Sequence, residues 1–188
     1  MKIATHDSAT GERPTWWSAL LTPFARTQGK TVKEQLECGC TMFDIRVKKV
    51  FGTWRCAHGW WFTKKTAEEI FRELSECEKD IHVLVTFEGK TGNADGFIDF
   101  ISGIKGKYPN IHYGAISSKY GKGAKGLRVK YDVLIAADED FTKDKTRQGF
   151  LPLDGRWQTY IPIPWLWKKI YNNKPEFNDD IFTFVDFL

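Results

Sequence analysis

A nearly continuous apolar run at residues 81–87 constrains this fold more than any other feature of the sequence. A run without alternating polar residues is typical of a strand that is buried on both faces. Residues 63–77 and 94–107, on either side of it, have helical character. In the first of these helices the apolar positions at helical spacing are Ala67, Ile70, Phe71 and Leu74. Strand alternating with helix predicts an α/β fold with a parallel sheet and helical crossovers.

Similar patterns predict further helices and strands along most of the chain. A capping box of Thr31 and Glu34 predicts a helix over 31–36. Further strands are expected at residues 2–5, 41–47, 54–57, 111–115, 131–137, 158–163 and 181–187, with a short helix at 165–171 and a loop rich in glycine and lysine at 119–126. With 188 residues and no low-complexity linker, residues 1–188 are expected to form a single domain.

Composition narrows the range of partners and compartments. The formal net charge of +4 suits an anionic substrate, but no lysine and arginine cluster alternates with aromatic residues, so no nucleic-acid partner is expected. The spacing of Cys38, Cys40, Cys56 and Cys77 favours buried free thiols over disulfides or a metal site. No apolar run has transmembrane length. The chain as given is expected to be a cytoplasmic monomer, or secreted if a leader was removed.

Polar residues that carry chemistry follow several of the predicted strands. His6 follows the first strand, Arg46 lies in the second, His58 follows the third, and Glu88 follows the apolar run. The downstream ends of parallel strands are where such sheets and barrels place their active sites. Histidine titrates near neutrality, and arginine stays charged and offers two parallel donors to phosphate oxygens. Two histidines and an arginine are therefore sufficient to cleave a phosphodiester by acid–base catalysis.

Each of these residues also has a plainer interpretation. His6 can be a cap or surface residue, His58 can be a turn residue before Gly59, and Arg46 can form a salt bridge within its strand. Their occurrence together, in this order along the chain, is what favours a functional site.

These residues carry a resemblance to a known family over roughly residues 1–90. The matching segments are His6-Asp7-Ser8-Ala9-Thr10, Gln35-Leu36-Glu37-Cys38-Gly39, Phe43-Asp44-Ile45-Arg46 and His58-Gly59. This pattern resembles the X region of bacterial phosphatidylinositol-specific phospholipase C, in the superfamily of phospholipase C-like phosphodiesterases. The closing strand with Asp186 resembles the last barrel strand of that family.

The resemblance implies a compact, distorted or incomplete (β/α) barrel of the TIM type. It also implies a phosphoric diester hydrolase or lyase acting on a phosphoinositide-like or glycerophosphodiester substrate. In that scheme His6 is the general base, His58 is the general acid, and Arg46 binds the phosphate. Asp186 would orient His6, and Asp7 would orient His58.

The remaining expectations concern substrate contacts and metal. Arg46, Glu88 and Trp60 are candidates for binding the substrate. The arginine occupies the space that a cation has in calcium-dependent relatives, so no cofactor is expected. The alternative is calcium or magnesium held by Asp44, Glu88 and Asp7, although calcium prefers six to eight oxygen ligands.

Two alternative functions stay open at this stage. One is a metal-dependent glycerophosphodiesterase or sphingomyelinase D-like enzyme on the same barrel. The other is a catalytically inactive module that binds a phosphate or a lipid headgroup. The eight tryptophans likewise have two interpretations, core packing or a rim that meets lipid headgroups as a peripheral membrane contact. Trp60 and Trp61, close after His58, are the best rim candidates.

Overall fold

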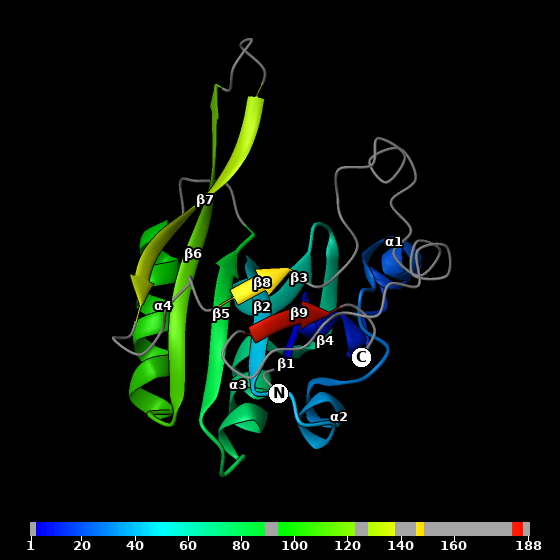
Figure 1. Ribbon diagram of the computed structural model, residues 1–188. Coiled ribbons are helices and arrows are strands. Elements are labelled where there is room, and N and C mark those ends of the chain that lie inside the picture. Colours follow the sequence, from blue (N-terminus) through cyan, green and yellow to red (C-terminus); the bar gives the residue numbers. More distant parts are fainter. Residues whose placement is uncertain (1–2, 89–93, 123–127, 138–145, 149–181, 186–188) are drawn as a thin grey trace.

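The computed structural model describes the backbone of residues 3–88, 94–122, 128–137, 146–148 and 182–185, with side chains over 3–88 and 96–115 (Figure 1). Its strands form one nine-stranded mixed sheet. The main path runs β7-β6-β5-β2-β1-β9-β8, and the hairpin of β3 and β4 attaches to β2. Over the described ranges β7 and β8 are the two ends of this path, so the structure shows a mixed sheet with helices rather than a closed barrel.

The parallel part of the sheet agrees with the sequence prediction. Its strands are β1 (Ile3–Thr5), β2 (Met42–Val50), β5 (Ile81–Phe87), β6 (Ile111–Lys122), β8 (Thr146–Gln148) and β9 (Phe182–Val185). Three further strands have only antiparallel neighbours, so the sheet is mixed where the sequence predicted a parallel one. They are β3 (Thr53–His58), β4 (Trp61–Thr66) and β7 (Arg128–Ala137).

The helices are η1 (Ser8–Gly11), η2 (Ala19–Leu21), α1 (Thr22–Ala25), α2 (Val32–Glu37), α3 (Ala67–Ser75) and α4 (Ala94–Lys107). The capping box of Thr31 and Glu34 is confirmed. The helix expected from residue 63 begins at Ala67, because Thr66 is its N-cap and residues 63–66 belong to β4. A second capping box, Thr66 with Glu69, fixes this start.

Other boundaries also differ from the prediction. Residues 119–122 of the expected loop belong to β6, which continues to Lys122 and pairs with β7. The predicted strand at 158–163 and helix at 165–171 lie outside the described residues, while the strand expected at 181–187 is seen as β9.

The hydrophobic core lies between the sheet and its two longer helices. The four apolar positions predicted for α3 are all buried, and α4 adds Phe97, Ile101 and Ile104 beside β5 and β6 (Figure 1). The half-buried Trp54 stacks on Phe100 with ring centroids 4.8 Å apart. This packing fixes β5 between its neighbours and so sets the positions of the strand ends.

Cysteines and tryptophans divide between core and surface. All four cysteines are free thiols; Cys40 and Cys56 are buried as predicted, whereas Cys38 is exposed. Burial raises the pKa of Cys40 to about 12. Trp61 is fully buried, so the prediction that it belongs to a rim is wrong, whereas Trp16 and Trp60 are largely exposed. None of the helices in the described ranges is long and apolar enough to span a bilayer.

Candidate active site

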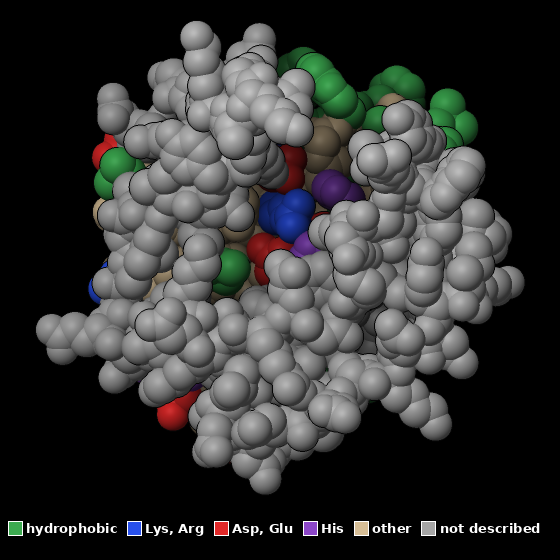
Figure 2. Space-filling model, turned by 45° about the horizontal axis from the view of Figure 1, so that its top comes forward, with side chains coloured by type: hydrophobic (Ala, Val, Ile, Leu, Met, Phe, Trp, Pro, Cys, Tyr) green, Lys and Arg blue, Asp and Glu red, His purple; other side chains and the backbone are tan. Residues whose placement is uncertain are grey.

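The polar residues singled out in the sequence meet at one end of the sheet. His6 directly follows β1, Arg46 lies in β2, and Glu88 directly follows β5, and these three strands are parallel neighbours. The antiparallel pairing of Val47 with Cys56 returns β3 alongside β2, so that His58 at the end of β3 lies near Arg46. Figure 2 shows cationic, histidine and acidic side chains together on this face.

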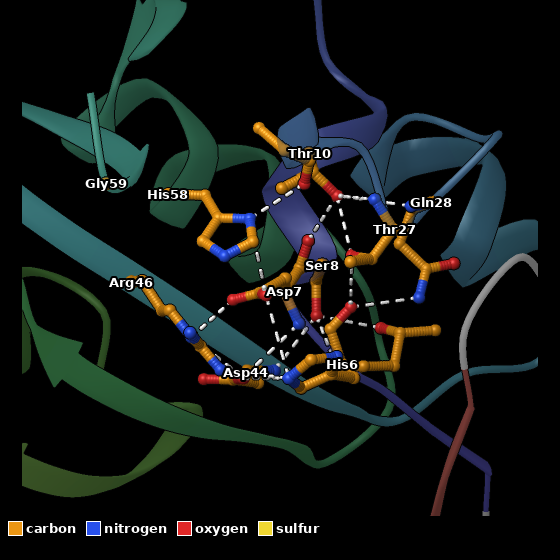
Figure 3. Close-up of polar contacts among 12 residues, drawn as sticks. His6, Asp7, Ser8, Thr10, Thr27, Gln28, Asp44, Arg46, His58 and Gly59 are labelled. Atoms are coloured by element: carbon orange, nitrogen blue, oxygen red, sulfur yellow. Dashed lines mark hydrogen bonds and ion pairs between the residues drawn. The ribbon is translucent and has the colours of Figure 1, made fainter. Parts of the chain in front are cut away.

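Arg46 is the centre of the cluster (Figure 3). Its Nε is ion-paired with Asp7 and lies 3.4 Å from Asp44 Oδ2. Its Nη1 lies 3.4 Å from Glu88 Oε1, and its Nη2 lies 2.9 Å from His6 Nε2. Burial alone would disfavour the charged guanidinium, but the attraction of three carboxylates outweighs it and raises the pKa of Arg46 above its ordinary value.

The contact with Arg46 defines the state of His6. A guanidinium has only donors, so the 2.9 Å contact requires Arg46 Nη2 to donate and His6 Nε2 to accept. His6 is therefore neutral in this arrangement, with its hydrogen on Nδ1. A neutral imidazole whose lone pair points into the site is the state that a general base requires.

His58 is held by a partner that the sequence did not indicate. Its Nδ1 lies 2.8 Å from the carbonyl oxygen of Ala25, whereas the nearest carboxylate oxygen to that nitrogen, Asp7 Oδ2, is 3.7 Å away. Because a carbonyl only accepts, Nδ1 of His58 carries a hydrogen. This hydrogen bond leaves Nε2 as the nitrogen that can exchange a proton with a substrate.

Asp7 lies between the two histidines. Its Oδ2 is 3.6 Å from His6 Nε2 and 3.7 Å from His58 Nδ1. The residue has a left-handed backbone conformation, with φ 45° and ψ 47°, which is uncommon for a residue other than glycine. Its amide donates to Asp44 Oδ2 at 3.2 Å, so the turn after β1 is fastened to β2. Backbone strain of this kind is often retained at functional sites.

Asp44 is a buried carboxylate beside Asp7. Burial raises its pKa; the like charge of Asp7 adds to this effect, and Arg46 opposes it. The upward shift prevails because one guanidinium is shared among Asp7, Asp44 and Glu88 and cannot neutralise all three. Asp44 Oδ1 is also buried without a hydrogen-bond partner among the described residues.

These acids partly satisfy the alternative of a metal site. His6, Asp7 and Asp44 each offer a ligand atom, and the three atoms lie within 4.8 Å of one another. One nitrogen and two carboxylates fall short of the six to eight oxygens that calcium prefers. Arg46 already pairs with both carboxylates, so a cation would have to compete with it.

Glu88 and Trp60, the other two predicted substrate contacts, are placed differently. Glu88 lies next to Arg46 and uses its Oε2 to accept a 3.1 Å hydrogen bond from the amide of Gly59. It thereby links the end of β5 to the turn after His58. The Trp60 side chain is 74% exposed, and the ammonium of Lys48 lies 4.4 Å from its ring centroid.

Sequence reasoning missed two buried residues that hold the backbone of His6. Thr27 Oγ1 and Gln28 Nε2 both donate to the His6 carbonyl, at 3.1 and 2.9 Å (Figure 3). Both lie in an irregular segment without periodicity, so no pattern in the sequence marks them. Asp186, the predicted partner of His6, lies outside the described residues.

Comparison with known proteins gives a likeness at the level of the fold. No family model and no curated protein matches the sequence. Among solved structures, a phosphatidylinositol-specific phospholipase C from Staphylococcus aureus with incorporated pentafluorophenylalanine has a TM-score of 0.54 at 16% identity. The match covers 98% of this chain and 85% of that one.

A second S. aureus structure, from work on the modulation of that enzyme's membrane binding, has a TM-score of 0.52 at 14% identity. It covers 98% of this chain and 85% of its own. At such identities the likeness shows the fold alone. The chain thus has a fold that phospholipase C enzymes use, and its chemistry must be argued from its own residues.

Proposed function

We propose that this protein is a phosphodiesterase of the phospholipase C type, which cleaves a phosphoinositide-like or glycerophosphodiester substrate by acid–base catalysis. The observation that carries the proposal is the meeting of His6, Arg46 and His58 around the Asp7 carboxylate. The fold shared with phosphatidylinositol-specific phospholipases C supports it. We also propose that the chain as a whole forms a distorted or incomplete (β/α) barrel.

Each group has a defined role in the proposed reaction. His6 Nε2 takes the proton from the attacking hydroxyl, whose oxygen forms a new bond to phosphorus. The bond from phosphorus to the leaving alcohol breaks, and His58, which starts the reaction protonated on both ring nitrogens, donates its Nε2 proton to the departing oxygen. Attack by a hydroxyl of the substrate's own headgroup gives a cyclic phosphate; attack by water gives a phosphomonoester. Each proton transfer contributes on the order of a hundredfold to ten-thousandfold.

Arg46 connects substrate binding to activation of the base. Its guanidinium offers donors to two phosphate oxygens, and it now donates one of them to His6. A bound phosphate would compete for this donor and release the Nε2 lone pair of His6. Arg46 would then stabilise the negative charge that grows on phosphate in the transition state.

Replacing each histidine tests this function. His6→Ala and His58→Ala should each lower turnover of phosphatidylinositol or glycerophosphoinositol by at least about a hundredfold. His112→Ala is the matched control, because His112 lies in β6 and stacks on His82 rather than on the cluster. Activity retained by both site variants would reject the two-histidine mechanism. A wild-type protein that binds but never cleaves these diesters would favour the inactive binding module.

The metal-dependent enzyme is the second candidate, and the cluster of His6, Asp7 and Asp44 is the observation that favours it. EDTA discriminates between the two mechanisms. The two-histidine enzyme should keep its turnover in excess chelator, whereas the metal-dependent enzyme should lose it and regain it with calcium or magnesium.

A lipid substrate requires contact with a membrane surface, and the exposed aromatic residues support such a contact. We define the apolar rim by its members Trp16, Trp17, Leu20, Leu21, Phe24, Phe51 and Trp60. Trp17 and Phe51 have ring centroids 6.1 Å apart, which joins two separate segments of the rim. Lys48 over the Trp60 ring adds positive charge that suits anionic headgroups. Figure 2 shows hydrophobic side chains gathered along one edge of the face that holds the cluster.

A further inference from the structure

One short segment contacts both histidines of the cluster. Residues 22–28 begin with α1 at Thr22, pass Ala25, and end at Thr27 and Gln28. The Ala25 carbonyl accepts the hydrogen bond from His58, and Thr27 and Gln28 donate to the carbonyl of His6. We call residues 22–28 the strap.

The carbonyl of Ala25 is suited to orient an imidazole. The last carbonyls of a helix have no partner within the helix, and Ala25 is the last residue of α1. Ala25 is buried, so water cannot easily replace His58 as the partner of this oxygen. At 2.8 Å this is a well-formed hydrogen bond, while the 3.7 Å separation from Asp7 exceeds hydrogen-bond distance.

The strap is itself fastened to the strand next to His58. The indole Nε1 of Trp61 donates to Thr22 Oγ1 at 3.1 Å, and the Trp61 side chain is fully buried. Trp61 begins β4 and pairs across the hairpin with His58. His58 is thus linked to Ala25, Ala25 to Thr22 through α1, and Thr22 to Trp61, which pairs with His58 across the hairpin.

The other end of the strap is fixed in the same way. Arg26 bends back to donate to the carbonyls of Gln28 and Gly29, at 2.9 and 3.2 Å. The hydroxyl of Thr10, one turn after His6, accepts from the amides of Thr27 and Gln28 at 3.0 and 3.1 Å. The strap therefore holds its shape through polar contacts to elements on both sides of the cluster.

We propose that the strap is a positioning element that sets both imidazoles, with the Ala25 carbonyl fixing the ring nitrogen of His58 that carries hydrogen. This inference rests on the proposed function for its catalytic meaning. It assigns the orientation of His58 to α1, whereas the family resemblance implied that Asp7 orients it. The strap residues act through the histidines and do not themselves need to touch the substrate.

The test is to loosen the strap without touching either histidine. Thr22→Val keeps the shape of the side chain but removes the acceptor of Trp61, and Thr22→Ser is the matched control that restores a hydroxyl. Measured at a pH where His58 is neutral, the ¹⁵N chemical shifts of its ring report which nitrogen carries hydrogen. We expect mixed tautomers in Thr22→Val, with kcat lower by about tenfold to a hundredfold and KM unchanged. Thr22→Ser should match the wild type in both measurements.

The outcomes separate this inference from the proposed function. Unchanged His58 shifts in a folded Thr22→Val protein would overturn the strap, whatever happens to kcat. Altered His58 shifts in a protein whose wild type cleaves no diester would support the strap and reject the phosphodiesterase. If Thr22→Val does not fold, Gln28→Met removes the donor to the His6 carbonyl instead. Unchanged ¹⁵N shifts of the His6 ring in this variant would then overturn the strap, and altered shifts would support it.

Discussion

Asp44 places a carboxylate in the interior, where the nearby Arg46 opposes the effect of burial. Its pKa is raised by burial, so the folded state binds its proton more tightly than the unfolded chain does. The stability that this group contributes is complete below the pKa of an unfolded aspartate, and is lost as pH rises through the higher folded value. Asp44→Asn removes this titration and should leave the free energy of unfolding less dependent on pH above about pH 4.

Urea unfolding at a series of pH values measures the difference between wild type and Asp44→Asn. We expect wild type to lose stability relative to the variant as pH rises toward neutrality. Glu88→Gln is a useful comparison, because Glu88 is at the edge of the same cluster and less deeply buried. If the stability of Asp44→Asn relative to wild type instead increased as the pH fell, this would contradict the raised pKa of Asp44.

Gly11 is required by a close approach rather than by an unusual backbone angle. A Cβ at this position would overlap the carbonyl oxygen of Lys30, which is backbone and cannot move aside easily. Gly11→Ala should destabilise the protein by about 1–3 kcal/mol, measured by chemical denaturation. Gly29→Ala is the matched control, since no heavy atom lies within 4 Å of its added Cβ. Equal stability of the two variants would show that the turn at residue 11 can open.

Single residues also show how far the sequence predicts the site. His6, Arg46 and His58 could be identified as candidates because they occur together, in this order and near strand ends, although each alone has a plainer interpretation. The contacts of His58 could not be predicted, because a backbone carbonyl has no sequence signature. The role of Gln28 was hidden for the same reason, since its partner is the carbonyl of His6. The sequence shows which side chains can carry chemistry, but only the three-dimensional structure shows which loops orient them.

Among the elements, α3 depends on a local signal at its start. Thr66 Oγ1 accepts from the Glu69 amide at 3.2 Å, and Glu69 Oε2 accepts from the Thr66 amide at 2.7 Å. Thr66→Ala leaves the Glu69 amide without this acceptor and removes the hydroxyl that donates to Glu69 Oε2, so it should cost about 1 kcal/mol of stability. Thr66→Ser keeps the hydroxyl and should cost less. Loss of the same stability in both variants, measured by thermal unfolding, would show that the methyl group and not the cap is what matters.

Elements were predicted well where periodicity is strong and poorly where pairing is non-local. The spacing of apolar residues located α3, although its predicted start was four residues too early, and α4 and β5 have the predicted bounds. The antiparallel pairing of β7 with β6 was missed, and residues 119–122 of the expected loop belong to β6. A strand's own residues specify its burial but not the direction of its neighbour.

At the scale of the whole molecule, the apolar rim and the polar cluster lie on one face (Figure 2). His58 and Trp60 are two residues apart at the turn between β3 and β4, and the strap carries the exposed Phe24 one residue before Ala25. A bilayer that received the rim would therefore lie close to the histidines. This geometry would let a phosphodiester enter the site from the membrane surface.

Binding to phospholipid vesicles tests this arrangement. Trp16 and Leu20 are each 89% exposed, and burying either side chain in a bilayer is worth about 1.5–3 kcal/mol. Trp16→Ser and Leu20→Ser should each weaken binding to vesicles of phosphatidylcholine and phosphatidylinositol by about tenfold or more, measured by co-sedimentation. Turnover of water-soluble glycerophosphoinositol should stay the same, because neither residue contacts the cluster in the described structure. Ile98→Ser is the matched control, since Ile98 is a 44% exposed apolar residue on α4, away from the rim. If Ile98→Ser weakens binding as much as the rim variants do, association is a general hydrophobic effect and this face has no special role in docking.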